Sequence, residues 1–219
     1  MSGPRLVILG KQGAGKGTQA ERLARHFSIP RISTGDMFRR AIRAGTEAGV
    51  EAERYMDSGE LVPDDIVIGI VEDRLSEPDA AHGFVLDGFP RTAEQAKALD
   101  DVLTRPAVDL VLELQVPTDI VLGRLAERRV CDNCGLPYSP ANRPKEDWIC
   151  DVCGGKVIQR DDDTEAAIKR RLDLYTQRTE PLVAYYMAQD KLATIDGTGD
   201  SNKVTSRILR GIEKRLGRT

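Results

Sequence analysis

Residues 10–18 read Gly10-Lys11-Gln12-Gly13-Ala14-Gly15-Lys16-Gly17-Thr18, and this stretch decides the fold. A short apolar run at residues 6–9 precedes it, and residues 19–25 follow with the composition of a helix. Glycines lack a Cβ atom and let the backbone wrap around a phosphate, and the start of a helix adds a partial positive charge there. Lys16 supplies a full charge that can reach the terminal phosphates of a nucleotide. The stretch predicts a phosphate-binding loop between a strand and a helix.

The loop fits the spacing G-x-x-x-x-G-K with one departure. Gly17 follows the lysine, where such loops carry a hydroxyl, and the hydroxyl comes one position later at Thr18. A glycine-rich turn without a ligand is the alternative interpretation. The strand before the loop and the helix after it are the context that phosphate binding requires, so we favour the phosphate site.

The chain has 219 residues and a formal net charge of −3, so no overall basic field indicates nucleic-acid binding. No apolar stretch approaches the roughly 18 residues of a membrane-spanning helix. The N-terminus lacks the apolar segment of a secretory signal. We therefore expect a cytoplasmic protein that binds neither nucleic acid nor membranes.

Short strand-like segments alternate with helical patterns along the chain. They lie at residues 6–9, 31–33, 84–86, 108–114 and 192–195. Because strands that alternate with helices form parallel sheets covered on both faces, we predict an α/β fold with a five-stranded parallel sheet flanked by helices.

This core is expected to be a single domain, residues 1–219, with two insertions. Its parts are residues 1–32, 63–126 and 164–219. Residues 33–62 have few large apolar side chains and are expected to form a small helical lobe rather than core. Residues 127–163 are expected to form a lid.

A second polar segment, residues 87–92, follows the apolar run at residues 84–86. Asp87 stands at the carboxyl end of this predicted strand, where ligands bind in open parallel sheets. In a chain with a phosphate-binding loop, such a carboxylate is suited to be an outer-shell partner of Mg²⁺. The alternative is an aspartate that only forms a turn with Gly88. The loop upstream favours the magnesium role.

All four cysteines lie in two C-x-x-C-G units. Cys131 and Cys134 form the first unit, and Cys150 and Cys153 form the second. This spacing is typical of zinc sites, and four thiolates complete a tetrahedron around Zn²⁺, so the metal is expected to be structural. Disulfide pairing is the alternative, which a cytoplasmic setting disfavours. A lobe with so few core-forming residues needs the metal for stability.

Basic residues are more numerous around the expected site than one nucleotide requires. They are Lys16, Arg39, Arg91, Arg124, Arg128, Arg160 and Arg171. Arg124 and Arg128 are four apart and share a helix face, which is more often a solvated surface, but this helix leaves the carboxyl end of a strand. The surplus of charge suits two phosphate chains that meet head to head. We expect movable lobes to close over the site and exclude water.

Several motifs in combination resemble those of adenylate kinases. They are residues 15–19, Ser33-Thr34-Gly35-Asp36-Met37, Asp87-Gly88-Phe89-Pro90-Arg91-Thr92 and Asp196-Gly197-Thr198. The resemblance covers nearly the whole chain, and the paired cysteine units are similar to those of the long-lid, zinc-containing bacterial form. It implies a P-loop kinase fold with a lobe that binds the nucleoside monophosphate and a zinc-bearing lid. It also implies an enzyme that uses Mg²⁺ to convert ATP and AMP into two ADP. We expect the protein to be a monomer.

The resemblance implies roles for individual residues. The residues implied for ATP are Gly13, Ala14, Gly15, Lys16, Gly17, Thr18, Arg128, Pro137, Tyr138 and the backbone of Gly199. We add Arg124, because it shares a helix face with Arg128. For AMP they are Thr34, Arg39, Glu60, Leu61, Val62, Gly88, Phe89, Pro90, Arg91 and Gln95, with Arg160 and Arg171 between the two nucleotides. The expected catalytic set is Lys16, Asp87, Arg91, Arg128, Arg160 and Arg171. Gln95 carries an amide that can pair with an adenine edge.

The loop departs from the family pattern at Lys11 and Gln12, where relatives often have a small residue and proline; this adds a cation near the phosphates. A kinase for another nucleoside monophosphate stays open, since Gln95 favours adenine without proving it. A GTPase would need Asn-Lys-x-Asp, and residues 202–205 lack the aspartate. A zinc-ribbon nucleic-acid binder would need a basic lid, but residues 131–153 contain more acidic than basic side chains.

Overall fold

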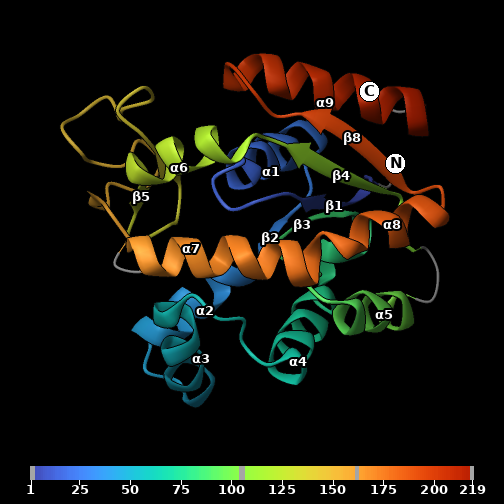
Figure 1. Ribbon diagram of the computed structural model, residues 1–219, viewed down its shortest axis with the longest axis horizontal. Helices are drawn as coiled ribbons and strands as arrows, with labels where there is room; N and C mark the ends of the chain where they lie inside the picture. Colours follow the sequence, from blue (N-terminus) through green and yellow to red (C-terminus); the bar gives the residue numbers. More distant parts are fainter. Residues whose placement is uncertain (1–2, 104–106, 161–162, 218–219) are drawn as a thin grey trace.

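A five-stranded parallel sheet forms the centre of the computed structural model, which describes residues 3–103, 107–160 and 163–217 (Figure 1). Its strands are β1 (Arg5–Leu9), β2 (Arg31–Ser33), β3 (Phe84–Asp87), β4 (Leu110–Gln115) and β8 (Leu192–Asp196). The spatial order is β2-β3-β1-β4-β8, and every neighbouring pair is parallel. The predicted sheet is confirmed. From β1 the chain goes to the edge strand β2 and returns to β3, and it then crosses to β4 and β8 on the other side of β1. Ligands bind outside the carboxyl ends of strands at such a reversal of direction.

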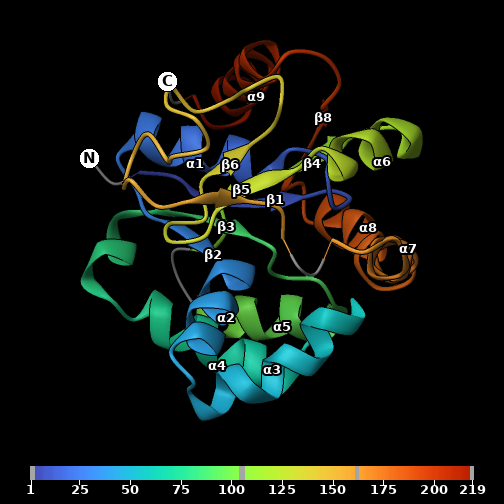
Figure 2. The same ribbon diagram turned by 90° about the vertical axis from the view of Figure 1, so that its left-hand side faces the viewer.

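Both faces of the sheet are buried, which explains the continuous apolar run in β1. Leu6 and Ile8 belong to one apolar cluster, whereas Val7 and Leu9 belong to the other. The first cluster includes residues of α1 (Lys16–Phe27), α6 (Thr118–Ala126) and α9 (Ser201–Leu216). The second includes residues of α4 (Asp64–Leu75), α5 (Ala93–Val102) and α8 (Pro181–Ala188). Figure 2 shows α1 and α9 above the sheet and α4 and α5 below it.

Helices α2 (Thr34–Arg43) and α3 (Glu47–Ser58) form the segment after β2. Ser33 caps α2, because its hydroxyl accepts a hydrogen bond from the backbone N–H of Asp36. Phe38, Ala52 and Val62 are buried in the second apolar cluster of the sheet. The sheet's core therefore extends into this segment, which the scarcity of large apolar residues did not predict.

After the lid the chain continues through α7 (Glu165–Leu174), a π-helical turn η2 (Tyr175–Thr179) and α8. Pro181 stands in the first turn of α8, where its missing N–H costs no helical hydrogen bond. A short 3₁₀ turn, η1 (Pro78–His82), precedes β3. Among the described residues, the helices are too short or too polar to cross a bilayer.

A small antiparallel sheet forms the lid segment, with strands β5 (Arg129–Cys131), β6 (Pro137–Tyr138) and β7 (Val157–Ile158) in the order β6-β5-β7. Its apolar cluster is separate from the two clusters of the main sheet. It contains Cys131, Tyr138, Cys150 and Val157, with Leu136 and Trp148 partly buried against them. Burial on this scale stabilises a lobe only weakly, so another source of stability is required.

Candidate functional site

A cleft of about 1330 Å³ lies at the carboxyl edge of the main sheet. This volume exceeds the roughly 300–1,000 Å³ of pockets that hold one small ligand. The cleft is lined by the loop after β1, by α2 and α3, and by the lid and α7. All nucleotide-contact residues predicted from the sequence line it, except Phe89, whose side chain is buried in the second apolar cluster.

Glycine geometry shapes the loop between β1 and α1. Gly13 has φ of +81°, and a Cβ atom there would lie 2.8 Å from Leu125 Cγ and 2.9 Å from the carbonyl oxygen of Val121. Gly15 has φ of +97° and is the left-handed N-cap of α1. The positive φ and these short distances both disfavour a side chain at Gly13. Glycine at this position therefore allows the loop to pass close to α6.

Lys16 is the first residue of α1, and its ammonium group folds back over the loop. Nζ donates to the carbonyl oxygens of Gly10 at 2.7 Å and Lys11 at 2.9 Å. Burial lowers the pKa of Lys16 to about 8; Asp87 opposes this change, and neighbouring arginines add to it. Since a bound anion favours the charged form, phosphate binding at this place would stabilise the ammonium ion.

The glycine that follows Lys16 has a steric explanation. A Cβ atom at Gly17 would lie 3.3 Å from Nη2 of Arg31 and 3.4 Å from Oδ2 of Asp87. These two atoms form an ion pair at 2.8 Å. Any side chain at Gly17 would therefore start in contact with the ion pair. The sequence indicates only a strand position for Arg31, because its partners lie far away along the chain.

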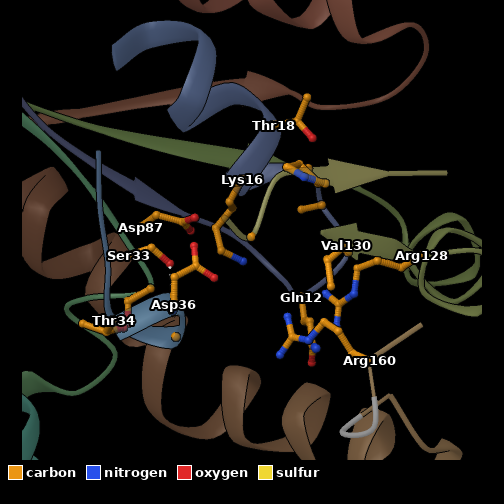
Figure 3. Close-up of a pocket in the computed structure, with 18 of the residues that line it drawn as sticks. Gln12, Lys16, Thr18, Ser33, Thr34, Asp36, Asp87, Arg128, Val130 and Arg160 are labelled. Atoms are coloured by element: carbon orange, nitrogen blue, oxygen red, sulfur yellow. Dashed lines mark hydrogen bonds between the residues drawn. The ribbon is translucent and has the colours of Figure 1, made fainter. Parts of the chain in front are cut away.

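Asp36 joins this cluster from α2. Its Oδ2 lies 2.9 Å from Nη2 of Arg31, and its Oδ1 pairs with Arg39. Burial raises the pKa of Asp36, but the two arginines outweigh it and hold the pKa below its usual value. Figure 3 shows Ser33, Asp36 and Asp87 on one side of Lys16. The sequence indicates no role for Asp36 beyond its place in a motif.

Gln12, Arg128 and Arg160 lie on the other side of Lys16 (Figure 3). The amide orientation that satisfies hydrogen bonding turns the Gln12 oxygen toward Arg171 Nη1 and Arg128 Nη2, at 2.9 Å from each. Arg128 also donates from Nε to Asp163 at 2.7 Å, and Arg171 donates to the carbonyl oxygen of Met56 at 2.8 Å. The loop thus holds together arginines from the base of the lid and from α7, a role for Gln12 that was not foreseen.

Arg124 and Lys11 have different surroundings from those expected. Arg124 donates to the carbonyl oxygens of Ala14 at 3.3 Å and Gly197 at 3.2 Å, so it ties the loop to the segment after β8. Lys11 turns toward α6, where Nζ donates to the hydroxyl of Thr118 at 2.8 Å. The additional cation of this loop is therefore directed at α6 rather than at the cleft.

The residues predicted to bind the monophosphate form a connected group. Arg91 Nε and the Thr34 hydroxyl both donate to the carbonyl oxygen of Gly88, at 2.8 Å and 2.9 Å. Gln95 donates from Nε2 to Asp64 at 2.7 Å and accepts from the backbone N–H of Arg91 at 2.8 Å. The amide expected to read adenine is engaged by protein groups here, so a base would have to replace one of these partners.

The four cysteines of the lid converge on one site. Their sulfur atoms lie within 4.8 Å of one another, with Cys131–Cys153 at 3.4 Å and Cys134–Cys150 at 3.6 Å. Bonded disulfide sulfurs are about 2.05 Å apart, so these thiols are unpaired. Four sulfurs around Zn²⁺, each at about 2.3 Å, would be separated by nearly 4 Å. The donor set fits a tetrahedral Zn²⁺ site, as the spacing predicted.

Tyr138 was predicted to contact ATP, and it lines the cleft. Its hydroxyl, however, points to the cysteine cluster, where it donates to Cys150 Sγ at 3.5 Å and accepts from the backbone N–H of Asp151 at 2.9 Å. The hydroxyl thus supports the metal site, which leaves the rest of the residue to face a nucleotide.

Comparison with known proteins adds independent evidence. The family model described as "Adenylate kinase" matches residues 8–191. An adenylate kinase from Salinispora tropica is 51% identical over 97% of this chain and 100% of its own length. One from Archaeoglobus fulgidus is 50% identical over 95% of this chain and 98% of its own, and one from Methanosarcina barkeri is 48% identical over the same shares.

Proposed function

Since this chain belongs to the adenylate kinase family and transfers a phosphoryl group from ATP to AMP to give two ADP, we propose that its cleft holds both nucleotides with their phosphate chains end to end. The observation that carries the proposal is the shared cleft. Residues expected to bind ATP and residues expected to bind AMP line one continuous space, larger than a single nucleotide pocket.

The electrostatics of the cleft support this arrangement. Burial, opposed by Asp87 and reinforced by nearby arginines, lowers the pKa of Arg91 to about 10. These arginines are Arg39, Arg160 and Arg171. Cations held this close repel one another, and two bound polyphosphates would remove that repulsion. The site is therefore organised for a highly charged transition state rather than for an empty cleft.

ATP is assigned to the loop side. Backbone N–H groups of residues 13–18 and the N-terminus of α1 bind its phosphates, and Lys16 leaves the carbonyl oxygens of Gly10 and Lys11 to contact them. The lid-side contacts are Arg128, Pro137 and Tyr138, and Arg124 holds the loop against the segment that contains Gly199.

AMP is assigned to the α2–α3 side. Thr34, Arg39 and Arg91 face its phosphate, and Gln95 reads its base after exchanging a protein partner. The backbone of residues 60–62 and 88–90 completes this pocket. Phe89 contributes through its backbone, since its side chain is buried in the core.

The transfer itself requires little chemistry from the protein. The AMP phosphate attacks the γ-phosphorus in line, and the bond to the β–γ bridging oxygen breaks. Arg128, Arg160 and Arg171 neutralise the charge on the transferring group, and Lys16 neutralises the leaving phosphate. Closure of the lid at residues 127–163 and of the lobe at residues 33–62 over the core excludes water, which would otherwise accept the phosphoryl group.

Two metals belong to the proposal. Family members use Mg²⁺ generally, and Asp87 offers carboxylate oxygens beside Lys16, which fits a magnesium partner. Mg²⁺ would supply neutralisation of the ATP phosphates. Zn²⁺ in the four-cysteine site would hold the lid together, as in the long-lid bacterial form.

We also propose that the protein acts as a cytoplasmic monomer. Both nucleotide sites are lined by one chain, so catalysis requires no partner residue. Four unpaired thiols suit a reducing compartment.

The test is ADP disproportionation: with Mg²⁺, purified protein should form ATP and AMP in equal amounts. Assays with AMP, UMP, CMP and GMP as acceptors define the base preference. A bisubstrate analogue with two linked adenosines should bind far more tightly than ATP. Arg91→Ala should weaken AMP binding far more than ATP binding. Saturation by one nucleotide, or an analogue no tighter than ATP, would contradict the shared-cleft arrangement.

A further inference from the structure

Arg31 occupies an unusual place beside the phosphate-binding loop. One atom, Nη2, lies 2.8 Å from Oδ2 of Asp87 and 2.9 Å from Oδ2 of Asp36. The two carboxylates come from the end of β3 and from α2, and Arg31 comes from β2. A single cationic group therefore bridges two carboxylates that arrive from different elements.

The cluster is sheltered from solvent. The side chains of Arg31, Asp36 and Asp87 are 15%, 14% and 11% exposed. Nε of Arg31 is buried and has no hydrogen-bond partner among the residues that the structure describes. The two carboxylates therefore provide the contacts that orient the guanidinium group, and they hold its pKa above the usual value against the effect of burial.

The position of this cluster connects it with the reaction. Gly17 lies against both Arg31 and Asp87, and Asp87 also raises the pKa of Lys16. Asp36 neighbours Arg39, which is assigned to AMP. Without Arg31, Arg39 would remain paired with this couple, on Oδ1 of Asp36. The Oδ2 atoms of Asp36 and Asp87 would then lose their shared cation next to the phosphate-binding loop, and the site would attract a divalent cation more strongly. With Arg31 between them, the three side chains carry a net charge of −1 and a cation already fills the gap.

We propose that Arg31 is a positioning residue that neutralises the Asp36–Asp87 pair in the nucleotide-free enzyme, so that Mg²⁺ enters the site with ATP instead of binding there alone. The inference rests on the magnesium role proposed for Asp87. In this proposal, Arg31 determines whether the nucleotide-free cleft binds free Mg²⁺ or only the complex of Mg²⁺ with ATP.

The experiment compares nucleotide-free, zinc-loaded proteins at constant ionic strength. Thermal unfolding is followed during titration with MgCl₂, and Mn²⁺ binding is followed by electron paramagnetic resonance. Wild type should show little response to either ion. Arg31→Gln should lower the ion concentration for half-saturation by about tenfold or more, because removal of a neighbouring positive charge strengthens attraction for the ion.

Two variants serve as controls. Arg25→Gln removes an arginine that pairs with Glu21 on the surface, and its ion response should equal that of wild type. The double variant R31Q/D36N removes one charge of each sign, and its ion affinity should fall back toward that of wild type. A merely structural role for Arg31 would lower the melting temperature of R31Q without changing its response to Mg²⁺.

Kinetics provide a second readout. At a fixed ATP concentration, Mg²⁺ in excess over ATP should inhibit R31Q at lower concentrations than it inhibits wild type. Equal magnesium responses of R31Q and wild type would overturn the proposal. If R31Q does not fold, the wild-type protein still tests the proposal. Nucleotide-free wild type that binds Mn²⁺ at the Mn²⁺ concentrations that just saturate its reaction with Mn–ATP would also overturn the proposal. Failure of ADP disproportionation in wild type would instead reject the proposed function, so the two failures are distinguishable.

Discussion

Gly135 of the lid lies directly against Asp36 of α2: a Cβ atom on Gly135 would be 3.2 Å from Cγ of Asp36. Arg43 of α2 also reaches the lid, with Nη2 3.5 Å from the carbonyl oxygen of Asn133. The first cysteine unit therefore rests on the helix that carries Arg39. We expect this contact between the lid and α2 to form when the cleft closes over both proposed nucleotide sites.

Gly135→Ala should oppose this closure. The added methyl group meets Asp36, and φ of +76° at this position is unfavourable for alanine. We expect affinity for a bisubstrate analogue to fall about tenfold, as overpacking by about 1–2 kcal/mol would cause. Gly154→Ala is the matched control, because Gly154 has φ of +70° in the second cysteine unit but no atom within 4 Å of the place that a methyl group would take. Equal losses in both variants would show that backbone strain, not the contact with Asp36, is responsible.

Tyr138→Phe should weaken the metal site and leave ATP binding nearly unchanged. The hydroxyl donates to Cys150 Sγ and would stabilise a metal-bound thiolate, and loss of such an outer-shell hydrogen bond typically costs about tenfold or more in metal affinity. Competition with a chromophoric chelator measures the zinc affinity, and the KM for ATP is measured in parallel. A raised KM with unchanged zinc affinity would mean that the hydroxyl serves the nucleotide instead.

Cys150→Ser should remove one zinc ligand and destabilise the lid. The lid's apolar cluster is small and separate from the clusters of the main sheet, so burial cannot replace the metal. We expect a lower melting temperature and a lower zinc content, with far less effect on turnover at low temperature. Wild type stripped of metal should melt like the variant. Identical melting of wild type with and without chelator would contradict a stabilising metal.

ATP affinity should depend on pH through Lys16. Its pKa is about 8 in the nucleotide-free protein, so the ammonium ion loses its proton as the pH rises past 8, and phosphate binding requires that proton. ATP binding should weaken progressively above about pH 8, toward tenfold per pH unit. Lys16→Arg stays charged throughout this range and should show a flat profile, whatever its affinity. The ATP affinity of both proteins is measured by equilibrium titration across this pH range. If wild type and Lys16→Arg showed the same pH dependence, a group other than Lys16 would be responsible for it.

Much of this protein was predictable from local patterns. The loop at residues 10–18 lies between a strand and a helix, the apolar runs form a five-stranded parallel sheet, and the two cysteine units converge on one site. Each of these features depends on residues that lie close together in the sequence or that recur at a characteristic spacing. Asp87 was found for the same reason, because an acidic residue at the end of a buried strand is a local signal.

Other features depended on which distant residues the fold brings together. Arg31 pairs with Asp87, Gln12 reaches Arg128 and Arg171, and the Tyr138 hydroxyl turns toward Cys150. Local patterns were enough to predict the loop, the sheet, the four-cysteine cluster and the family. Which charges neutralise one another around the cleft follows from the packing of distant segments. Ion pairs and hydrogen bonds require atoms within a few ångströms, and no local pattern specifies that proximity.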